Sequence, residues 1–267
     1  MKILGILNIT TDSFSDGGKY LAPEAALAHA QSLADAGADI IDIGAASSNP
    51  DAGAVASELE IARLASVVPA LKAKGLSLSI DSFAPEVQRW ALEQPIDYLN
   101  DIHGFPDPAL YPALAASDAK LIVMHAIQAR GIATREDVPP QEIMERIFRF
   151  FDARLAALEV AGIARGRLIL DPGMGFFLGT NPENSLTVLG RLPELKKRYR
   201  LPLLVSVSRK SFLRAMAGDD EARLTGMTAA AEAMAVLKGG ADYIRTHAPA
   251  ALRDGLKRLK GLEKTGR

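Results

Sequence analysis

The stretch "LLVSVSRKSFLRAM" (203–216) indicates the fold class, because a buried strand passes into a helix without a linker. Leu203–Val207 is largely apolar, and the apolar residues from Ser211 onward recur with helical spacing. Between these segments stand Arg209 and Lys210, each flanked by a serine. A helix N-terminus already presents unpaired N–H groups and a positive dipole end, so two added cations favour a bound group that is anionic or rich in acceptors.

The same strand-to-helix unit recurs along the whole chain. The predicted strands are Ile3–Asn8, Asp39–Gly44, Leu76–Asp81, Tyr98–Asp101, Lys120–His125, Arg167–Asp171, Leu203–Val207 and Tyr243–His247. The predicted helices are Pro23–Gly37, Ser57–Lys74, Pro85–Glu93, Ala109–Ser117, Pro140–Gly162, Asn184–Arg198, Ser211 onward with Thr225–Gly239, and Pro249–Leu262.

Eight such units with apolar strands predict an α/β fold, a single (β/α)8 TIM barrel that spans residues 1–267 as one domain. An open doubly wound sheet is the alternative. That fold usually shows a glycine-rich dinucleotide turn after an early strand, and "SDGGKY" (15–20) lacks the G-x-G-x-x-G spacing.

The amino-acid composition limits the classes of molecule that this protein is expected to bind. The 267 residues are 48% hydrophobic and 24% charged, with a net charge of −1, so no global field gathers nucleic acid or a membrane surface. Cysteine is absent from the sequence, which excludes disulfides, thiolate metal sites and a cysteine nucleophile. The first residues turn polar too early for an export signal. We expect a cytoplasmic protein that acts on small molecules.

Polar side chains end nearly every predicted strand. The set is Asn8, Asp81, Asn100, Asp101, His125, Asp171, Ser208, Arg209, Lys210, Arg245 and His247. In a barrel these strand ends form one face, where catalytic residues are found. Simpler roles stay open: Asp81 could cap the next helix, His125 could be a hydrogen-bonded structural residue, and Phe177 could be core packing.

The residue types at these strand ends divide into two kinds of site. Asp81, Asn100 and Asp171 suit a flat heterocycle with an amino-pyrimidine edge, because a carboxylate accepts two parallel N–H bonds. Arg245 and His247, with Asn8 on the adjacent first strand, suit phosphate oxygens and a hard metal ion such as Mg²⁺. The eighth strand is a recurrent place for phosphate in this fold.

Seven motifs at these positions resemble the dihydropteroate synthase family over nearly the whole chain. They are "GILNITTDSFSDGG" (5–18), "GADIIDIG" (37–44), "SIDS" (79–82), "NDI" (100–102), "LDPGMGF" (170–176), "VSRKSF" (207–212) and "ADYIRTHAP" (241–249). Further segments are similar to the sulfonamide-insensitive (Sul-type) branch of that family: "AASSNPDA" (45–52), "GFPDPALYP" (104–112), "GIATR" (131–135) and "DPGMGFFLG" (171–179).

The resemblance implies condensation of 6-hydroxymethyl-7,8-dihydropterin pyrophosphate with 4-aminobenzoate to 7,8-dihydropteroate, by a homodimer. Asp81, Asp171 and Lys210 are the implied catalytic residues. The implied substrate contacts are Ser48, Asp81, Asn100, Met124, Asp171, Phe176, Phe177, Lys210, Ser211, Arg245 and His247, and Asn8 is implied for Mg²⁺.

Three departures from the family pattern bear on the site. Asn49 stands where the family has a loop arginine, which leaves Ser48 as the expected ligand contact there. Phe177 replaces a small residue beside Phe176, the expected aminobenzoate contact. The segment "MHAIQARGIATRED" (124–137) lacks the family's Met-Gln-Gly continuation.

Two other functions stay open. One is a methyltransferase-like enzyme on the same pterin-binding barrel, which would have no pyrophosphate to hold. The other is a catalytically silent pterin-binding homologue, motivated by the missing loop arginine.

Overall fold

The computed structural model describes the chain except residues 11–22, 49–50, 52, 129–130 and 266–267. The described strands are β1 (Lys2–Asn8), β2 (Ile40–Gly44), β3 (Leu78–Asp81), β4 (Tyr98–Asp101), β5 (Lys120–Met124), β6 (Leu168–Asp171), β7 (Leu204–Val205) and β8 (Tyr243–Thr246). They form one sheet of parallel pairs in the order β6-β5-β4-β3-β2-β1-β8-β7. A parallel bridge between Leu170 and Leu203 joins the two edges, so the sheet closes into the predicted (β/α)8 barrel.

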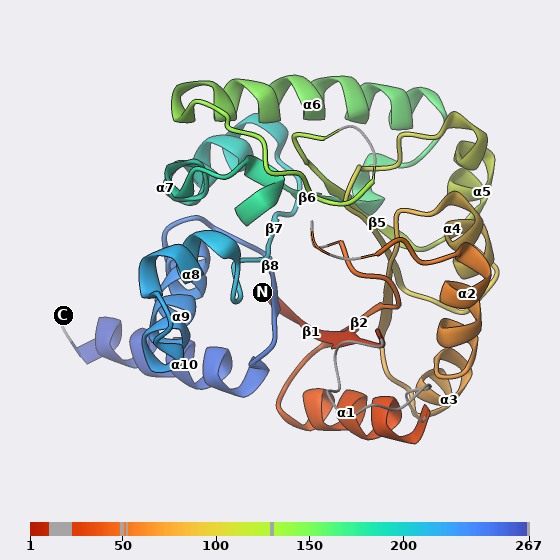
Figure 1. Cartoon of the computed structure of the whole chain (residues 1–267), viewed down its shortest axis with the longest axis horizontal. Coiled ribbons are helices and arrows are strands. Elements are labelled where there is room, and N and C mark those ends of the chain that lie inside the picture. Colours follow the sequence, from red (N-terminus) through yellow and green to blue (C-terminus); the bar gives the residue numbers. More distant parts are fainter. Residues whose placement is uncertain (11–22, 49–50, 52, 129–130, 266–267) are drawn as a thin grey trace.

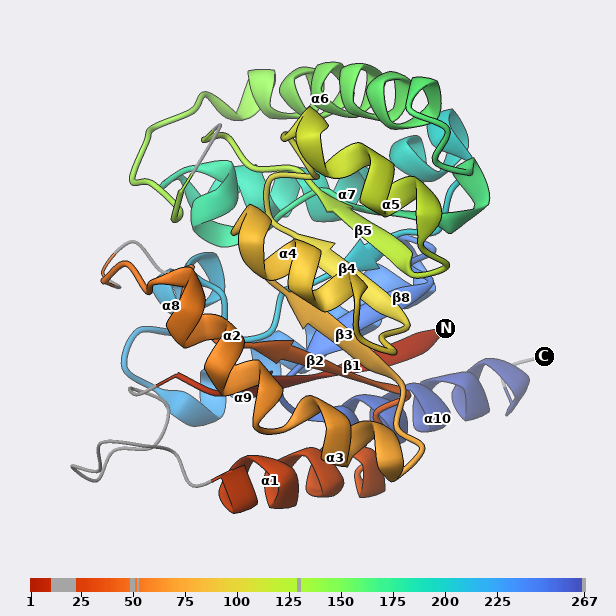
Figure 2. The ribbon, with the colours of Figure 1, turned by 90° about the vertical axis from the view of Figure 1, so that its right-hand side faces the viewer.

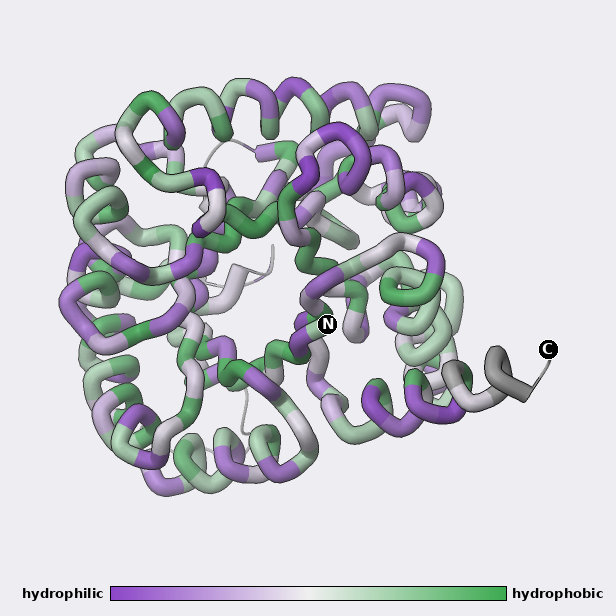
Figure 3. The backbone as a smooth tube through the Cα atoms, turned by 180° about the vertical axis from the view of Figure 1, so that it is seen from behind, coloured by the Kyte–Doolittle hydropathy of each residue, from purple (hydrophilic) through white to green (hydrophobic). Residues whose placement is uncertain are grey.

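The helices form a ring outside the strands (Figure 1). They are α1 (Pro23–Asp35), α2 (Ser57–Ala65), α3 (Val68–Ala73), α4 (Pro85–Leu92), α5 (Tyr111–Ala116), α6 (Pro140–Val160), α7 (Pro182–Tyr199), α8 (Ser211–Ala217), α9 (Glu221–Leu237) and α10 (Pro249–Thr265). Apolar side chains on their inner faces pack against the outward-facing strand residues in one continuous core. The hydropathy colouring shows green along the strands and purple mainly on the helices (Figure 3).

Two predicted elements are wrong in detail. The single helix expected over Ser57–Lys74 is divided into α2 and α3, because Pro69 is the second residue of α3 and has no N–H to donate to a preceding turn. The last predicted strand before the cation pair keeps only Leu204–Val205 as a paired strand. The chain therefore leaves the sheet earlier than expected, and Ser206 and residues 208–210 line the barrel mouth, while Val207 is buried in the core.

Side-chain alternation along the strands decides what faces the barrel interior. One apolar layer fills the barrel: Leu4, Ile40, Tyr98, Ile122, Ile169, Leu204 and Tyr243. Two residues further along the chain from these seven positions stand Ile6, Asp42, Asn100, Met124, Asp171, Ser206 and Arg245. These side chains consequently face the interior one level higher, so a mainly polar layer, interrupted by Ile6 and Met124, lies directly above an apolar one.

The N-terminus and the last described turn of α10 lie at the end of the barrel where the strands begin (Figure 2). The polar layer lies toward the opposite end, where the strands finish and the loops into the helices start. Among the described residues, no helix combines the length and the apolarity needed to cross a bilayer.

Candidate active site

A cavity of about 1020 Å³ opens at the carboxyl ends of the strands. Its wall includes many of the predicted site residues: Asn8, Ser48, Asp81, Phe176, Phe177, Lys210, Ser211, Arg245 and His247. Asn100, Met124 and Asp171 lie buried next to it, at 3%, 6% and 2% exposure. The closed barrel therefore brings the predicted residues of all eight strands to one end.

Arg245 is held between two carboxylates at the wall of this cavity. Its Nε donates to Asp42 Oδ2 at 2.5 Å and its Nη2 donates to Asp81 Oδ2 at 2.7 Å. Asp42 is fully buried on β2, and its other carboxylate oxygen has no hydrogen-bond partner among the described residues. Sequence reasoning missed Asp42, although a charge inside the apolar run "IIDIG" (40–44) is a signal that could have found it.

Burial dominates the titration of the two predicted catalytic aspartates. It raises the pKa of Asp81 to about 7, against the opposing effect of Arg245. It also raises the pKa of Asp171 to about 6, although Gly173 N donates to its Oδ1 at 2.8 Å and Lys210 lies nearby. Burial lowers the pKa of Lys210 to about 8, with Arg245 acting in the same direction. These groups change charge within a narrow range around neutrality.

The two adjacent cations after β7 take different environments. Arg209 is exposed at the cavity wall and has a left-handed backbone, with φ of 54°. Lys210 occupies the residue before α8, and its Nζ lies 4.9 Å from the centre of the Phe177 ring. The sequence predicted two cations together at this helix start. In the structure the ammonium group of Lys210 lies inside the cavity, and the guanidinium group of Arg209 lies at its rim.

The loop after β6 comes close to the start of α8. Gly175 has φ of 66°, and a Cβ added there would lie 2.8 Å from Ser211 Oγ, so a larger residue would displace one of the two segments. Phe176 and Phe177 follow directly in a short 3₁₀ turn. The backbone at Gly175 thus lies against the start of α8, and Phe176, Phe177 and Ser211 all line the cavity.

Phe177 is both a cavity-wall residue and a packing residue. It is 6% exposed and belongs to a small apolar cluster with Ile102, Met124, Ala126 and Ala133. Its face toward Lys210 contributes to the cavity lining.

Several inward polar atoms have no protein hydrogen-bond partner among the described residues. They include Asn100 Oδ1, Ser79 Oγ and Ser206 Oγ. Buried polar atoms in native proteins are normally satisfied, so such atoms grouped at one cavity point to a ligand or to water as their partner. Their position beside Asp81 and Asp171 agrees with the predicted heterocycle subsite.

His247 and Asn8 lie at the part of the wall formed by β8 and β1. Ser208 Oγ is 2.9 Å from His247 Nδ1. Partial burial of the ring, and then the charge of Arg245, lower the pKa of His247. A Cβ at Gly44 would lie 3.5 Å from Asn8 Oδ1 and 3.9 Å from Asp81 Oδ2, so glycine leaves room beside both oxygens.

The oxygen and nitrogen donors at this part of the wall suit only a metal ion that takes few ligands from the protein. Among the described residues, no group of three or more His, Cys, Asp or Glu side chains is arranged to hold a metal. A single amide oxygen from Asn8, with space beside it, suits Mg²⁺ that keeps several waters and is carried mainly by substrate phosphates.

Two of the simpler alternatives are decided by contacts. The residue before α4 is Ala84, and Asp81 pairs with Arg245, so the helix-cap role for Asp81 is wrong. His125 Nδ1 lies 3.1 Å from Pro172 O, and its ring packs edge-on against Phe150, which makes it a buried structural residue. Asn49 and residues 11–18 of the first motif lie outside the described residues.

Comparison with known proteins decides the family. The family described as "Pterin binding enzyme" matches residues 4–247. Dihydropteroate synthase type-2 of Escherichia coli is 58% identical over 265 residues, which cover 99% of this chain and 97% of the relative. The chain belongs to the dihydropteroate synthase family. Dihydropteroate synthases are transferases of folate biosynthesis, and the predicted family and enzyme class are confirmed.

Solved dihydropteroate synthases share the fold. The structure of the Xanthomonas albilineans dihydropteroate synthase with 4-aminobenzoic acid has a TM-score of 0.87 and 35% identity, and covers 98% of this chain and 93% of that chain. A structure of the Xanthomonas albilineans enzyme in complex with 7,8-dihydropteroate has a TM-score of 0.80 and 30% identity, and covers 98% and 92%. In both structures the similarity extends over almost the full length of the Xanthomonas albilineans chain.

Proposed function

We propose that this dihydropteroate synthase binds the dihydropterin ring at the buried end of the cavity and 4-aminobenzoate at its mouth. The observation that carries this orientation is the gradient along the cavity. Buried carboxylates and unpartnered polar atoms lie deepest, and Phe176 lies at the wall near the opening. A flat, hydrogen-bonding ring fits the first region, and a benzoate ring fits the second.

Asp171 and Asn100 are the proposed partners of the pterin edge. Both are buried and both face the interior directly above the apolar layer. The carboxylate of Asp171 accepts N–H groups of the amino-pyrimidine, and Asn100 Oδ1 accepts a further one, which would satisfy an otherwise unpaired buried oxygen. Met124 and the apolar cluster beside it cover a face of the ring.

The pyrophosphate is proposed to lie at β8 and β1. Arg245 and His247 would contact its oxygens, and Asn8 would contribute an oxygen ligand to Mg²⁺. When bound, Mg²⁺ neutralises charge on the leaving pyrophosphate. Arg245 would have to share its donors between phosphate and the carboxylates of Asp42 and Asp81 that it contacts in the structure.

The reaction needs no enzyme nucleophile. The amino nitrogen of 4-aminobenzoate forms a bond to the methylene carbon of the pterin while the bond from that carbon to the pyrophosphate oxygen breaks. The leaving oxygen keeps the electron pair, and the nitrogen loses one proton. Positive charge that develops on the carbon is shared with the electron-rich dihydropterin, and the fixed negative charges of Asp81 and Asp171 stabilise it.

Release of pyrophosphate by the purified protein tests this function. Both substrates together with Mg²⁺ should give stoichiometric 7,8-dihydropteroate and pyrophosphate. A protein that binds pterin without releasing pyrophosphate would be the silent homologue, and turnover that needs a methyl donor would indicate the methyltransferase-like activity.

Poor inhibition by sulfonamides is part of the proposal. A sulfonamide is bulkier than 4-aminobenzoate where the compact carboxylate would lie. Phe177 adds volume beside Phe176 in the wall of the same cavity that Ser211 lines, so it would exclude the bulkier group.

The enzyme is further proposed to act as a homodimer in the cytoplasm. Large apolar side chains are exposed on the last helices, among them Met216 and Met234 at 40% and 43%. Sedimentation velocity of the purified chain measures the oligomeric state directly.

A further inference from the structure

The loop between β5 and α6 lies between two other loops at the cavity mouth. In its described part, Ala133 N donates to Ser48 O at 3.0 Å, which joins it to the loop after β2. Thr180 N donates to Glu136 O at 2.9 Å, which joins it to the loop after β6. This loop contains most of the segment 124–137, which departs from the family pattern, and the loop has no role in the proposed reaction. Its described part therefore connects both sides of the opening.

Arg135 makes the side-chain contacts within this arrangement. Its Nη2 lies 2.7 and 2.6 Å from the two carboxylate oxygens of Asp51. Its guanidinium carbon lies 5.8 Å from the centre of the Phe176 ring. Asp51 and Phe176 both line the cavity, although they come from loops more than a hundred residues apart in the sequence.

The physical effect of these contacts is orientation. Both charged side chains are more than half exposed, so the ion pair itself contributes little to the stability of the fold. A planar guanidinium over an aromatic ring, however, favours one ring orientation, and lysine does not reproduce this geometry. Arg135 thus restrains the Phe176 ring while its donors hold the loop that carries Asp51 and Ser48.

We propose that Arg135 is a positioning residue that determines how well the mouth of the cavity accepts 4-aminobenzoate. It fixes the Phe176 ring as a flat wall for the benzoate and keeps the loop after β2 beside it. This inference rests on the proposed function, because it needs the aminobenzoate subsite at Phe176. The inference assigns to the "GIATR" segment (131–135) a role in binding 4-aminobenzoate and not the pyrophosphate substrate.

Steady-state kinetics of Arg135→Ala, Arg135→Lys and Asp51→Ala tests the role. Arg135→Ala should raise the KM for 4-aminobenzoate at least tenfold and change kcat and the KM for the pyrophosphate substrate less than twofold. Arg135→Lys keeps a charge near Asp51 but loses the planar contact, so its KM should lie in between. Arg135 and Asp51 act as one unit, so the double variant with alanine at both positions should resemble Arg135→Ala alone.

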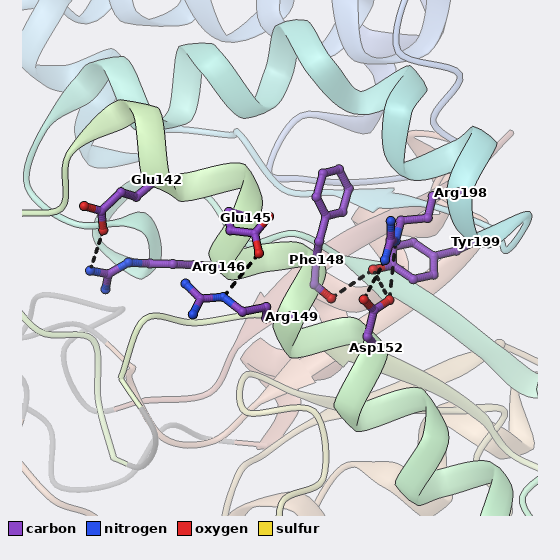
Figure 4. A network of polar contacts seen from close by, with 8 residues as sticks. All are labelled: Glu142, Glu145, Arg146, Phe148, Arg149, Asp152, Arg198 and Tyr199. Atoms are coloured by element: carbon purple, nitrogen blue, oxygen red, sulfur yellow. Dashed lines mark hydrogen bonds and ion pairs between the residues drawn. The ribbon is translucent and has the colours of Figure 1, made fainter.

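Arg198 provides a matched control (Figure 4). Its Nη2 lies 2.6 Å from Asp152 Oδ2, and its guanidinium carbon lies 5.1 Å from the centre of the Phe148 ring. The chemistry and the exposure resemble those of Arg135, but the contact joins α6 to α7 and none of the three residues lines the cavity. Arg198→Ala should leave both KM values unchanged, and thermal melting of both variants shows whether they lose similar stability.

The outcomes separate the two levels of inference. Wild-type protein that releases no pyrophosphate contradicts the proposed function. Active wild-type protein in which Arg135→Ala alters the aminobenzoate KM no more than Arg198→Ala does, or alters both substrate KM values equally, overturns the role of Arg135 alone.

Discussion

Asp81 Oδ2 accepts a hydrogen bond from Arg245 Nη2 at 2.7 Å, while the same arginine donates to the fully buried Asp42. One cation thus lies between two carboxylates from neighbouring strands. Breaking a buried pair by removing one partner leaves an uncompensated charge, which typically costs about 3–5 kcal/mol. The charge state of this cluster is therefore coupled to its geometry.

Replacing Asp81 or Asp171 by alanine should lower kcat/KM at least about a hundredfold, the scale of losing one preorganised electrostatic group. Initial rates of pyrophosphate release measure this effect, and circular dichroism controls for folding. Near-normal turnover in either variant would mean that the pterin subsite is assigned to the wrong residues.

Arg245→Ala should weaken binding of the pyrophosphate substrate more than binding of a pterin that lacks phosphate. The variant also leaves Asp42 and Asp81 without their cation, so a moderate loss for both ligands is expected on top of the phosphate effect. Calorimetry with the two ligands gives the difference. Asp42→Asn serves as the control that disturbs the cluster but keeps the arginine, and equal losses for both ligands in Arg245→Ala would remove Arg245 from the phosphate site.

The pH dependence of kcat/KM should be bell-shaped, with its maximum between about pH 7 and 8. Asp81 and Asp171 have pKa values raised to about 7 and about 6, so the two side chains become carboxylates as the pH rises through about 6 and about 7, on the acid side of the maximum. Lys210, whose pKa is lowered to about 8, loses its charge above the maximum. This profile reports the free enzyme.

In Lys210→Met the alkaline limb of that profile should disappear, and the acid limb should move to higher pH. The shift upward follows because the lysine charge lowers the pKa of both aspartates in the wild-type enzyme. An unchanged alkaline limb in this variant would assign that limb to another group.

The free energy of unfolding at acid pH should depend on the protonation of His125. Burial lowers its pKa from 6.5 to about 4, so the folded protein binds the proton less well than the unfolded chain. The resulting stabilisation is fully present above pH 6.5 and is lost as the pH falls through about 4, a change of roughly 3 kcal/mol. In His125→Asn this part of the loss should be absent when urea unfolding is measured from pH 7 to pH 4.

Comparison of the two proteins at each pH isolates the histidine. Asp81 and Asp171 have raised pKa values and so change stability in the opposite direction, but they are common to both proteins. Parallel pH curves for the wild-type protein and His125→Asn would contradict the assignment.

Phe177→Gly should lower the inhibition constant for the sulfonamide sulfamethoxazole at least tenfold and change the aminobenzoate KM much less. Rejecting one misfitting group is typically worth about 1–3 kcal/mol. Because Phe177 also packs against Met124 and Ala133, the glycine variant will lose stability, and Phe177→Leu controls for packing. A constant ratio of the two kinetic values in Phe177→Gly would leave Phe177 with a packing role only.

The sequence by itself determined the architecture and the residues at the strand ends. Strand and helix periodicity are local properties, and a parallel barrel brings every carboxyl strand end to one face whatever the loops do. For this reason Asp81, Asp171, Lys210 and Arg245 could be predicted as one site. The seven motifs were sufficient to predict the family from the sequence alone.

Only the tertiary structure decided which of these groups touch. Asp42 and Arg245 are 203 residues apart, and their contact depends on strand register and barrel closure, which no local pattern encodes. The different exposure of the neighbouring Arg209 and Lys210 goes with a left-handed backbone at Arg209, which the residue types do not encode. The raised pKa values of the aspartates arise from desolvation, which is a property of the packed surroundings and not of the residue type.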